Sequence, residues 1–120
     1  MPRYVDGFVV VVAKRKLAAY RTHARMGARL WREHGALEYR ECVGEAMAPG
    51  FGNPFPRMAR CRRGETVVFS WIVYRSKPHR KRVMERVMKD PRSAAMSDPK
   101  RLPFDVKRMA CGGFEEMAGF

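Results

Sequence analysis

The 120-residue chain has few cysteines, no long apolar run and few acidic side chains, and each shortage excludes a class of protein. Its three cysteines, Cys42, Cys61 and Cys111, are odd in number and form no CxxC pair. We therefore expect neither a disulfide framework nor a zinc site. Reduced thiols also lead us to expect a cytoplasmic location. No stretch approaches the roughly 20 apolar residues that span a bilayer. The basic cluster 14–16 follows the first apolar run, the reverse of a secretory signal. We therefore expect no membrane partner.

Catalytic signatures are also missing from the chain. There is no HExxH, GxSxG, P-loop or GxGxxG motif, and His23, His34 and His79 share no metal-ligand spacing. We therefore expect no bound metal and no cofactor.

The shortage of acidic residues leaves a large positive charge. Lys and Arg number 25 against 12 Asp and Glu, a net charge of +13. Such a surplus raises nucleic acid or another polyanion as a partner. The hydrophobic fraction, 46%, is ordinary for a globular protein, so we expect one folded domain over residues 1–120.

The first third of the chain predicts a strand, a helix and a strand. A β-branched and aromatic run predicts a strand over residues 4–13. Apolar side chains at helical spacing predict a helix over 14–34, which ends at Gly35. Alternating apolar and polar residues predict a second strand over 36–45.

The rest of the chain is predicted from its prolines, glycines and apolar runs. We expect a loop over 46–56 and a short strand over 57–61. A polar turn over 62–65 then leads to a long strand over 66–74. A second helix is expected to begin at the N-cap Ser76, to carry Pro78 in its first turn and to end at Pro91. A loop over 91–104 and a last strand over 105–117 complete the chain, and Gly112 and Gly113 indicate a bulge or a close backbone approach.

This order of elements, β-α-β-(β)-β-α-β, predicts an α+β fold, a ferredoxin-like sandwich with a short extra strand near Met58. The strands at 4–13 and 66–74 are apolar on both faces, yet two helices cover only one face of a sheet. The second face therefore needs another partner, and a second copy of the chain is the simplest one. We expect a homodimer.

Five segments resemble, in order and spacing, a small uncharacterised bacterial family typified by YbaA. They are YVDGFVVVV at 4–12, HGALEYREC at 34–42, ETVVFSWIVY at 65–74, MKDPR at 88–92 and LPFDVKRMACGGFE at 102–115. The resemblance implies membership of the dimeric α/β-barrel superfamily, in which two ferredoxin-like protomers place their sheets face to face around a cavity. It implies no reaction.

Polar residues within the apolar strands are the candidates for a site, because a buried polar group needs a partner. In one interpretation, Asp6 or Glu41 forms an ion pair with Arg108 or Arg40 and fixes the strand register. In the other, Asp6 or Glu41 lines a cavity as a general base. The side chains expected to bind the ligand there are Phe8, Trp71, Arg108 and Phe114.

Two further residues have weaker claims to a catalytic role. His23 lies on the flank of the first predicted helix, where it faces either solvent or the sheet. Cys42 has no histidine beside it in sequence, and a buried thiol is usually inert packing.

The cationic side chains gather in two clusters. The first helix places Lys14, Arg21, Arg25, Arg29 and Arg32 within an arc of about 80°, and residues 75–92 hold eight basic side chains. Two functions follow. The first is binding of a small molecule in the sheet-lined cavity of the homodimer, with or without cofactor-independent catalysis. The alternative is binding of nucleic acid or another polyanion by the helical faces, unless these are merely solvated.

Overall fold

The computed structural model describes residues 1–120, which form a four-stranded sheet and four α-helices. In chain order the elements are β1 (Tyr4–Ala13), η1 (Lys14–Lys16), α1 (Leu17–Glu33), β2 (Glu38–Val43), α2 (Phe55–Met58), β3 (Glu65–Tyr74), α3 (Lys77–Lys89), α4 (Pro91–Met96), η2 (Val106–Arg108) and β4 (Ala110–Glu115). The predicted α+β class is confirmed.

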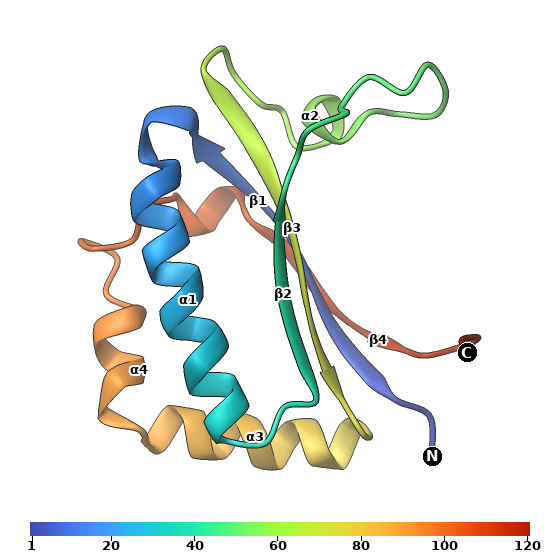
Figure 1. The fold of residues 1–120 in the computed structure, drawn as a ribbon, viewed down its shortest axis with the longest axis vertical. Helices are drawn as coiled ribbons and strands as arrows, with labels where there is room; N and C mark the ends of the chain where they lie inside the picture. The colour runs from blue at the N-terminus through green and yellow to red at the C-terminus, as the bar shows by residue number, and fades with distance from the viewer.

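The sheet is antiparallel throughout, with the strand order β2-β3-β1-β4. Its two long strands, β1 and β3, lie in the middle, and Val10 of β1 is opposite Val68 of β3. Helices α1, α3 and α4 all lie on one side of the sheet (Figure 1). The opposite side is uncovered except at one end, where the segment that contains α2 crosses it (Figure 1).

The signals for the helix ends lie where the sequence placed them. Gly35 ends α1 with a φ of +103°, the left-handed conformation that favours glycine. The Ser76 hydroxyl caps α3 by accepting a hydrogen bond from the His79 N–H, and Pro78 sits in the first turn. The predicted helix over 14–34 begins instead as the 3₁₀ turn η1 and continues as α1.

The short strand predicted over 57–61 is wrong, and so is the extra strand in the predicted fold class. This segment holds the single helical turn α2 and then a turn. Proline explains the difference, because Pro56 occupies the first turn of α2, where its fixed φ fits a helix and its missing N–H costs nothing.

Two other predictions for the second half of the chain need correction. Residues 91–96 form α4 rather than a loop, because the Asp90 carboxylate caps the helix at the Arg92 N–H and Pro91 fits its first turn. The last strand covers only Ala110–Glu115, not 105–117, since the 3₁₀ turn η2 precedes it. At Gly113 the predicted close approach is found: a Cβ there would overlap the Tyr4 hydroxyl oxygen.

The buried side chains gather mainly between the sheet and the helices. One cluster consists of Leu30, Ile72, Tyr74, Val83 and Val87, and a second of Val10, Val12, Tyr20 and Val68. On the uncovered side of the sheet, Phe69 and Phe114 remain 45% and 59% exposed. The helices therefore bury one apolar face of the sheet and leave the other open.

Candidate functional site

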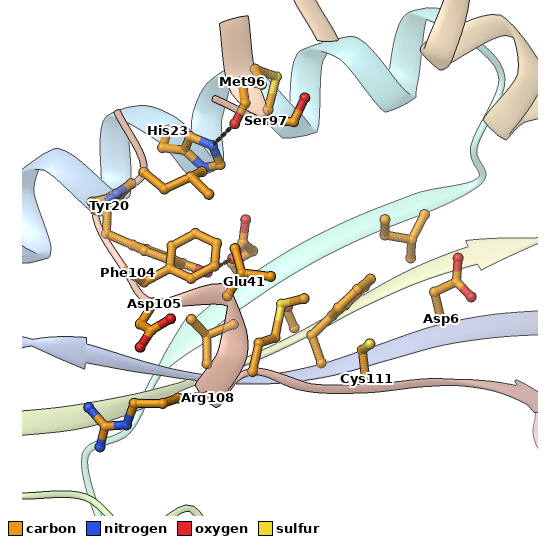
Figure 2. Close-up of a pocket in the computed structure, with 18 of the residues that line it drawn as sticks. Asp6, Tyr20, His23, Glu41, Met96, Ser97, Phe104, Asp105, Arg108 and Cys111 are labelled. Carbon is orange, nitrogen blue, oxygen red and sulfur yellow. Dashed lines mark hydrogen bonds between the residues drawn. The ribbon is translucent and has the colours of Figure 1, made fainter. Parts of the chain in front are cut away.

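A cavity of about 1210 Å³ lies between the sheet and the helices. All four strands contribute to its floor, α1, α3 and α4 supply its walls, and the segment after α4 lines one end. Figure 2 shows Tyr20 and His23 of α1 projecting toward the strands, with Phe104 beside Tyr20. This cavity belongs to one chain and lies on the helix side of the sheet.

Strand alternation decides which predicted site residues reach this cavity. Asp6 and Phe8 of β1 face the helices and line the cavity. Trp71 is opposite Gly7 and Phe114 is opposite Val5, so both project from the uncovered side of the sheet. The structure therefore does not bring the four predicted ligand-binding side chains together.

Arg108, the fourth of these residues, lies at the rim of the cavity. Its guanidinium donates hydrogen bonds to both carboxylate oxygens of Glu65, at 2.7 and 2.8 Å. Arg108 holds the pKa of Glu65 down to about 2. Arg108 is thus committed to a structural ion pair that joins η2 to β3.

The Glu41 carboxylate is held by two tyrosine hydroxyls inside the cavity. The Tyr20 hydroxyl donates to Oε1, and the Tyr39 hydroxyl donates to Oε2 at 2.7 Å. Glu41 is in no salt bridge. The ion pair expected between Glu41 and an arginine is therefore wrong: Arg40 projects from the other side of β2, where it pairs with Glu38 at 3.2 Å.

Both tyrosines remain protonated donors. Burial raises the pKa of the Tyr20 and Tyr39 hydroxyls, and the neighbouring Glu41 raises it further. Tyr39 reaches this position because α1 has a glycine there: a Cβ at Gly27 would lie 2.5 Å from the Tyr39 hydroxyl oxygen. The cluster of Glu41, Tyr20 and Tyr39 carries one formal negative charge.

Asp6 belongs to a second polar cluster that is already neutralised. The Asp6 side chain is buried, and the Arg80 Nε donates to both of its oxygens at 2.9 Å. The Tyr74 hydroxyl donates to Asp6 at 3.1 Å and accepts from the Trp31 indole N–H at 3.2 Å. The predicted structural ion pair of Asp6 exists, with Arg80 in place of Arg108 or Arg40.

His23 faces the cavity rather than solvent. Its Nε2 lies 3.0 Å from the carbonyl oxygen of Met96, as the dashed line in Figure 2 marks. A carbonyl oxygen only accepts hydrogen bonds, so Nε2 carries a proton and a neutral ring leaves Nδ1 as an acceptor. The bond also joins the middle of α1 to the end of α4.

Several residues of the site carry no direct signal in the sequence. In the sequence, Tyr20 and Tyr39 belong to the apolar patterns of their predicted helix and strand, and Arg80 is one of the eight basic side chains of residues 75–92. Tyr39 and Glu41 alternate on one face of β2, which does indicate their proximity. The contact from Tyr20 to Glu41, by contrast, depends on how α1 packs on the sheet.

The structure adds two findings about other classes of site. No group of three or more His, Cys, Asp or Glu side chains is placed to hold a metal ion. None of the helices is both long and apolar enough to cross a bilayer.

Comparison with known proteins places the chain among uncharacterised relatives. The family model described as "Protein of unknown function (DUF1428)" matches residues 3–106. The chain is 42% identical over 115 residues to the uncharacterized protein YbaA of Escherichia coli strain K12 and to that of Shigella flexneri, covering 96% of this chain and 97% of each relative. Among solved structures it is similar to the de novo designed protein Foldit4, with a TM-score of 0.46, 14% identity, and coverage of 98% of this chain and 99% of that one. The relatives bring no ligand or reaction to this chain.

Proposed function

Since the chain belongs to the DUF1428 family, whose function is unknown, we propose its function from the cavity: it binds a small, mainly apolar molecule that carries a hydrogen-bond donor or a positive charge. Glu41 is the group that recognises this donor. The molecule's apolar part packs against Phe8, Ile72 and Met84.

The observation that carries the proposal is a carboxylate in the cavity that forms no salt bridge with any cation of the chain. Glu41 is half-buried, and its two hydrogen-bond donors are neutral hydroxyls. A charge removed from water is costly unless it is paired. Each carboxylate oxygen also retains acceptor capacity after one bond from tyrosine. An ammonium or N–H group on a ligand would supply the missing partner.

The size and lining of the cavity support a small molecule as the ligand. Its volume of about 1210 Å³ is enough for a metabolite, since typical ligand pockets measure ~300–1,000 Å³. About half of the residues that line it are aliphatic, aromatic or sulfur-containing, and the rest include charged and hydroxyl side chains. The hydrophobic half can pack against an apolar body, and the polar groups can orient it through hydrogen bonds.

Proton transfer on the bound molecule, without a cofactor, is the catalytic extension of this proposal. Asp6 is unsuited to act as the base because Arg80 neutralises it. Glu41 and His23 both line the cavity, and a neutral His23 ring keeps Nδ1 as an acceptor, so these two side chains are the proposed bases.

We further propose that the chain is a cytoplasmic homodimer in which two ferredoxin-like protomers place their uncovered sheet faces together, as in dimeric α/β barrels. Support comes from the antiparallel order β2-β3-β1-β4 and from the exposed Phe69 and Phe114 on one contiguous face. Exposed apolar patches of this kind mark protein interfaces. The three cysteines are free, which supports a reducing compartment.

Three probes with one phenyl ring and different charges test the ligand class. We expect 2-phenylethylamine to raise the melting temperature of the chain more than 2-phenylethanol, and phenylacetate to raise it least. Glu41→Gln keeps the size of the side chain and removes its charge, so the preference for the amine should fall by about tenfold or more in affinity.

Glu85→Gln is the matched control, because Glu85 is exposed on α3 outside the cavity and makes the same change in net charge. This variant should retain the preference for the amine. Equal affinity for the three probes, or an amine preference that survives Glu41→Gln, would contradict the proposal.

A further inference from the structure

The outer face of α1 carries a row of arginines that no part of the chain neutralises. Arg21, Arg25, Arg29 and Arg32 are all exposed, and none takes part in a salt bridge. At 100° per residue they fall within an arc of about 80°. We call these four residues the arginine row.

The helix offers the arginine row no internal counter-charge. Glu33 is the only acidic residue of α1, and its carboxylate is already bound by Arg92. Arg21, Arg25 and Arg29 follow one another at spacings of four residues, at which like charges repel. The exposed row is therefore unfavourable for the helix itself, and a bound anion would relieve the repulsion.

The start of α1 adds to the positive potential. The 3₁₀ turn η1 consists of Lys14, Arg15 and Lys16, all exposed, and no acidic residue lies in the first turn of α1. A helix N-terminus is itself the positive end of the macrodipole. Basic side chains and the helix dipole thus attract anions to the same end of the arginine row.

The residues around the arginine row indicate which polyanion fits. Small residues, Ala18, Thr22 and Ala28, lie beside the arginines. Met26, the one large apolar side chain exposed on α1, lies outside their arc, so a membrane surface is a poor fit. A helix that binds a membrane surface needs a broad apolar face instead.

Single strands are also a poor fit. The aromatic residues of α1, Tyr20 and Trp31, both pack toward the core, so no ring lies beside the row to stack on a base. The four arginines extend over about 16 Å of helix at 1.5 Å per residue, a length that spans several phosphates of a duplex.

We propose that the arginine row binds the sugar-phosphate backbone of double-stranded nucleic acid. Guanidinium groups form paired hydrogen bonds with phosphate oxygens, which lysines cannot match. The contacts reach only the backbone, so binding is independent of base sequence. The row lies on the side of α1 away from the cavity, so this activity is separate from the binding of a small molecule.

Fluorescence anisotropy with a labelled 20-base-pair DNA duplex, an RNA duplex of the same sequence and a single strand tests this proposal. For the full chain we expect duplex binding that persists at about 150 mM salt, with a log-log salt slope of about −3 to −4, since each phosphate contact contributes roughly −0.9. The single strand should bind at least several-fold more weakly. The two duplexes distinguish DNA from RNA as the source of the phosphates.

Replacing Arg21, Arg25 and Arg29 by glutamate should weaken duplex binding by at least about 100-fold. It should also reduce the magnitude of the log-log salt slope by about three. The control reverses Arg57, Arg62 and Arg63, which are exposed in and after α2 and change the net charge equally. We expect less than about a fivefold loss in this control. Circular dichroism checks that both variants fold.

Three results would overturn the proposal. The first is an equal loss of affinity in the two triple variants, which would mean that only net charge matters. The second is tighter binding to the single strand than to either duplex. The third is stronger binding, dependent on the arginine row, to vesicles of phosphatidylserine and phosphatidylcholine than to the duplexes.

Discussion

The contacts of single side chains determine the shape and charge of the cavity. Gly27 allows Tyr39 to reach Glu41, and Arg80 neutralises Asp6 while no cation reaches Glu41. Two carboxylates that look equivalent in the sequence therefore differ in whether a cation pairs with them. Asp6 is part of the structural framework, whereas Glu41 is the group available to a ligand.

Gly27→Ala tests this packing. Alanine normally stabilises a helix by roughly 0.5–1 kcal/mol over glycine. Here the new Cβ would overlap the Tyr39 hydroxyl, so we expect destabilisation by about 1–3 kcal/mol. Urea unfolding of the variant measures the change.

Tyr39→Phe provides the paired control because it removes the clashing oxygen. The cost of Gly27→Ala should shrink when it is measured in the Tyr39→Phe background, as expected for residues in contact. A stabilising Gly27→Ala in the wild-type chain would show that helix and strand are not this close.

At the scale of elements, periodicity predicted β1, β3, α1 and α3, because each contains its own signal. Apolar spacing and caps such as Ser76 and Gly35 are local, and so they can be read without the fold. The strand predicted near Met58 and the first six residues of the loop predicted over 91–104 differ from the structure, because a proline in the sequence suggests a break. At both places a proline instead occupies the first turn of a short helix.

The first turn of α3 depends on a neutral histidine. His79 is buried, and its Nδ1 accepts a hydrogen bond from the Arg75 N–H at 2.9 Å. Burial lowers the pKa of His79 below 6.5, and the nearby Arg75 and Arg82 lower it further. Protonation would remove the acceptor and place a charge among arginines.

Stability should therefore fall as the solution becomes acidic. The folded pKa lies below the unfolded one, so the unfolded chain binds more protons once the pH drops below about 6.5. The stability contributed by His79 is complete above that pH and declines below it. Urea unfolding between pH 5 and 7 measures the decline.

His79→Gln keeps a hydrogen-bond acceptor and does not titrate in this range. The difference in unfolding free energy between variant and wild type should consequently change with pH, in the direction that favours the variant at pH 5. A difference that stays constant across the range would contradict the assigned role of His79.

For the whole molecule, the sequence predicted two apolar faces of the sheet but not which one the helices cover. Alternation shows that Asp6 and Phe8 share a face, and that Trp71 shares one with Phe69. Both faces are apolar, so local pattern cannot assign either to the helices. Phe8, Trp71 and Phe114 were therefore grouped in one cavity, although they lie on opposite sides.

The resemblance to the family typified by YbaA was confirmed at this scale, while the proposed dimer is open to measurement. Sedimentation at micromolar concentration should give about 28 kDa, twice the 13.9 kDa of one chain. Phe69→Asp with Phe114→Asp should shift the species toward the mass of one chain, because both charges would be buried in the interface.

The control introduces the same number of aspartates at exposed apolar residues outside the open sheet face. Met26→Asp with Met88→Asp alters two exposed apolar residues on α1 and α3, on the helix side of the sheet, and should leave the mass unchanged. A wild-type chain that sediments at the mass of one protomer at all concentrations would remove the dimer from this account.

A crystal structure of the chain with 2-phenylethylamine tests the central claim most directly. We predict the amine nitrogen within about 3 Å of the Glu41 carboxylate, with the phenyl ring against Phe8 and Ile72 in the cavity between sheet and helices. An amine bound elsewhere, such as on the open face beside Trp71, or a cavity that stays without the amine at saturating concentration, would contradict it.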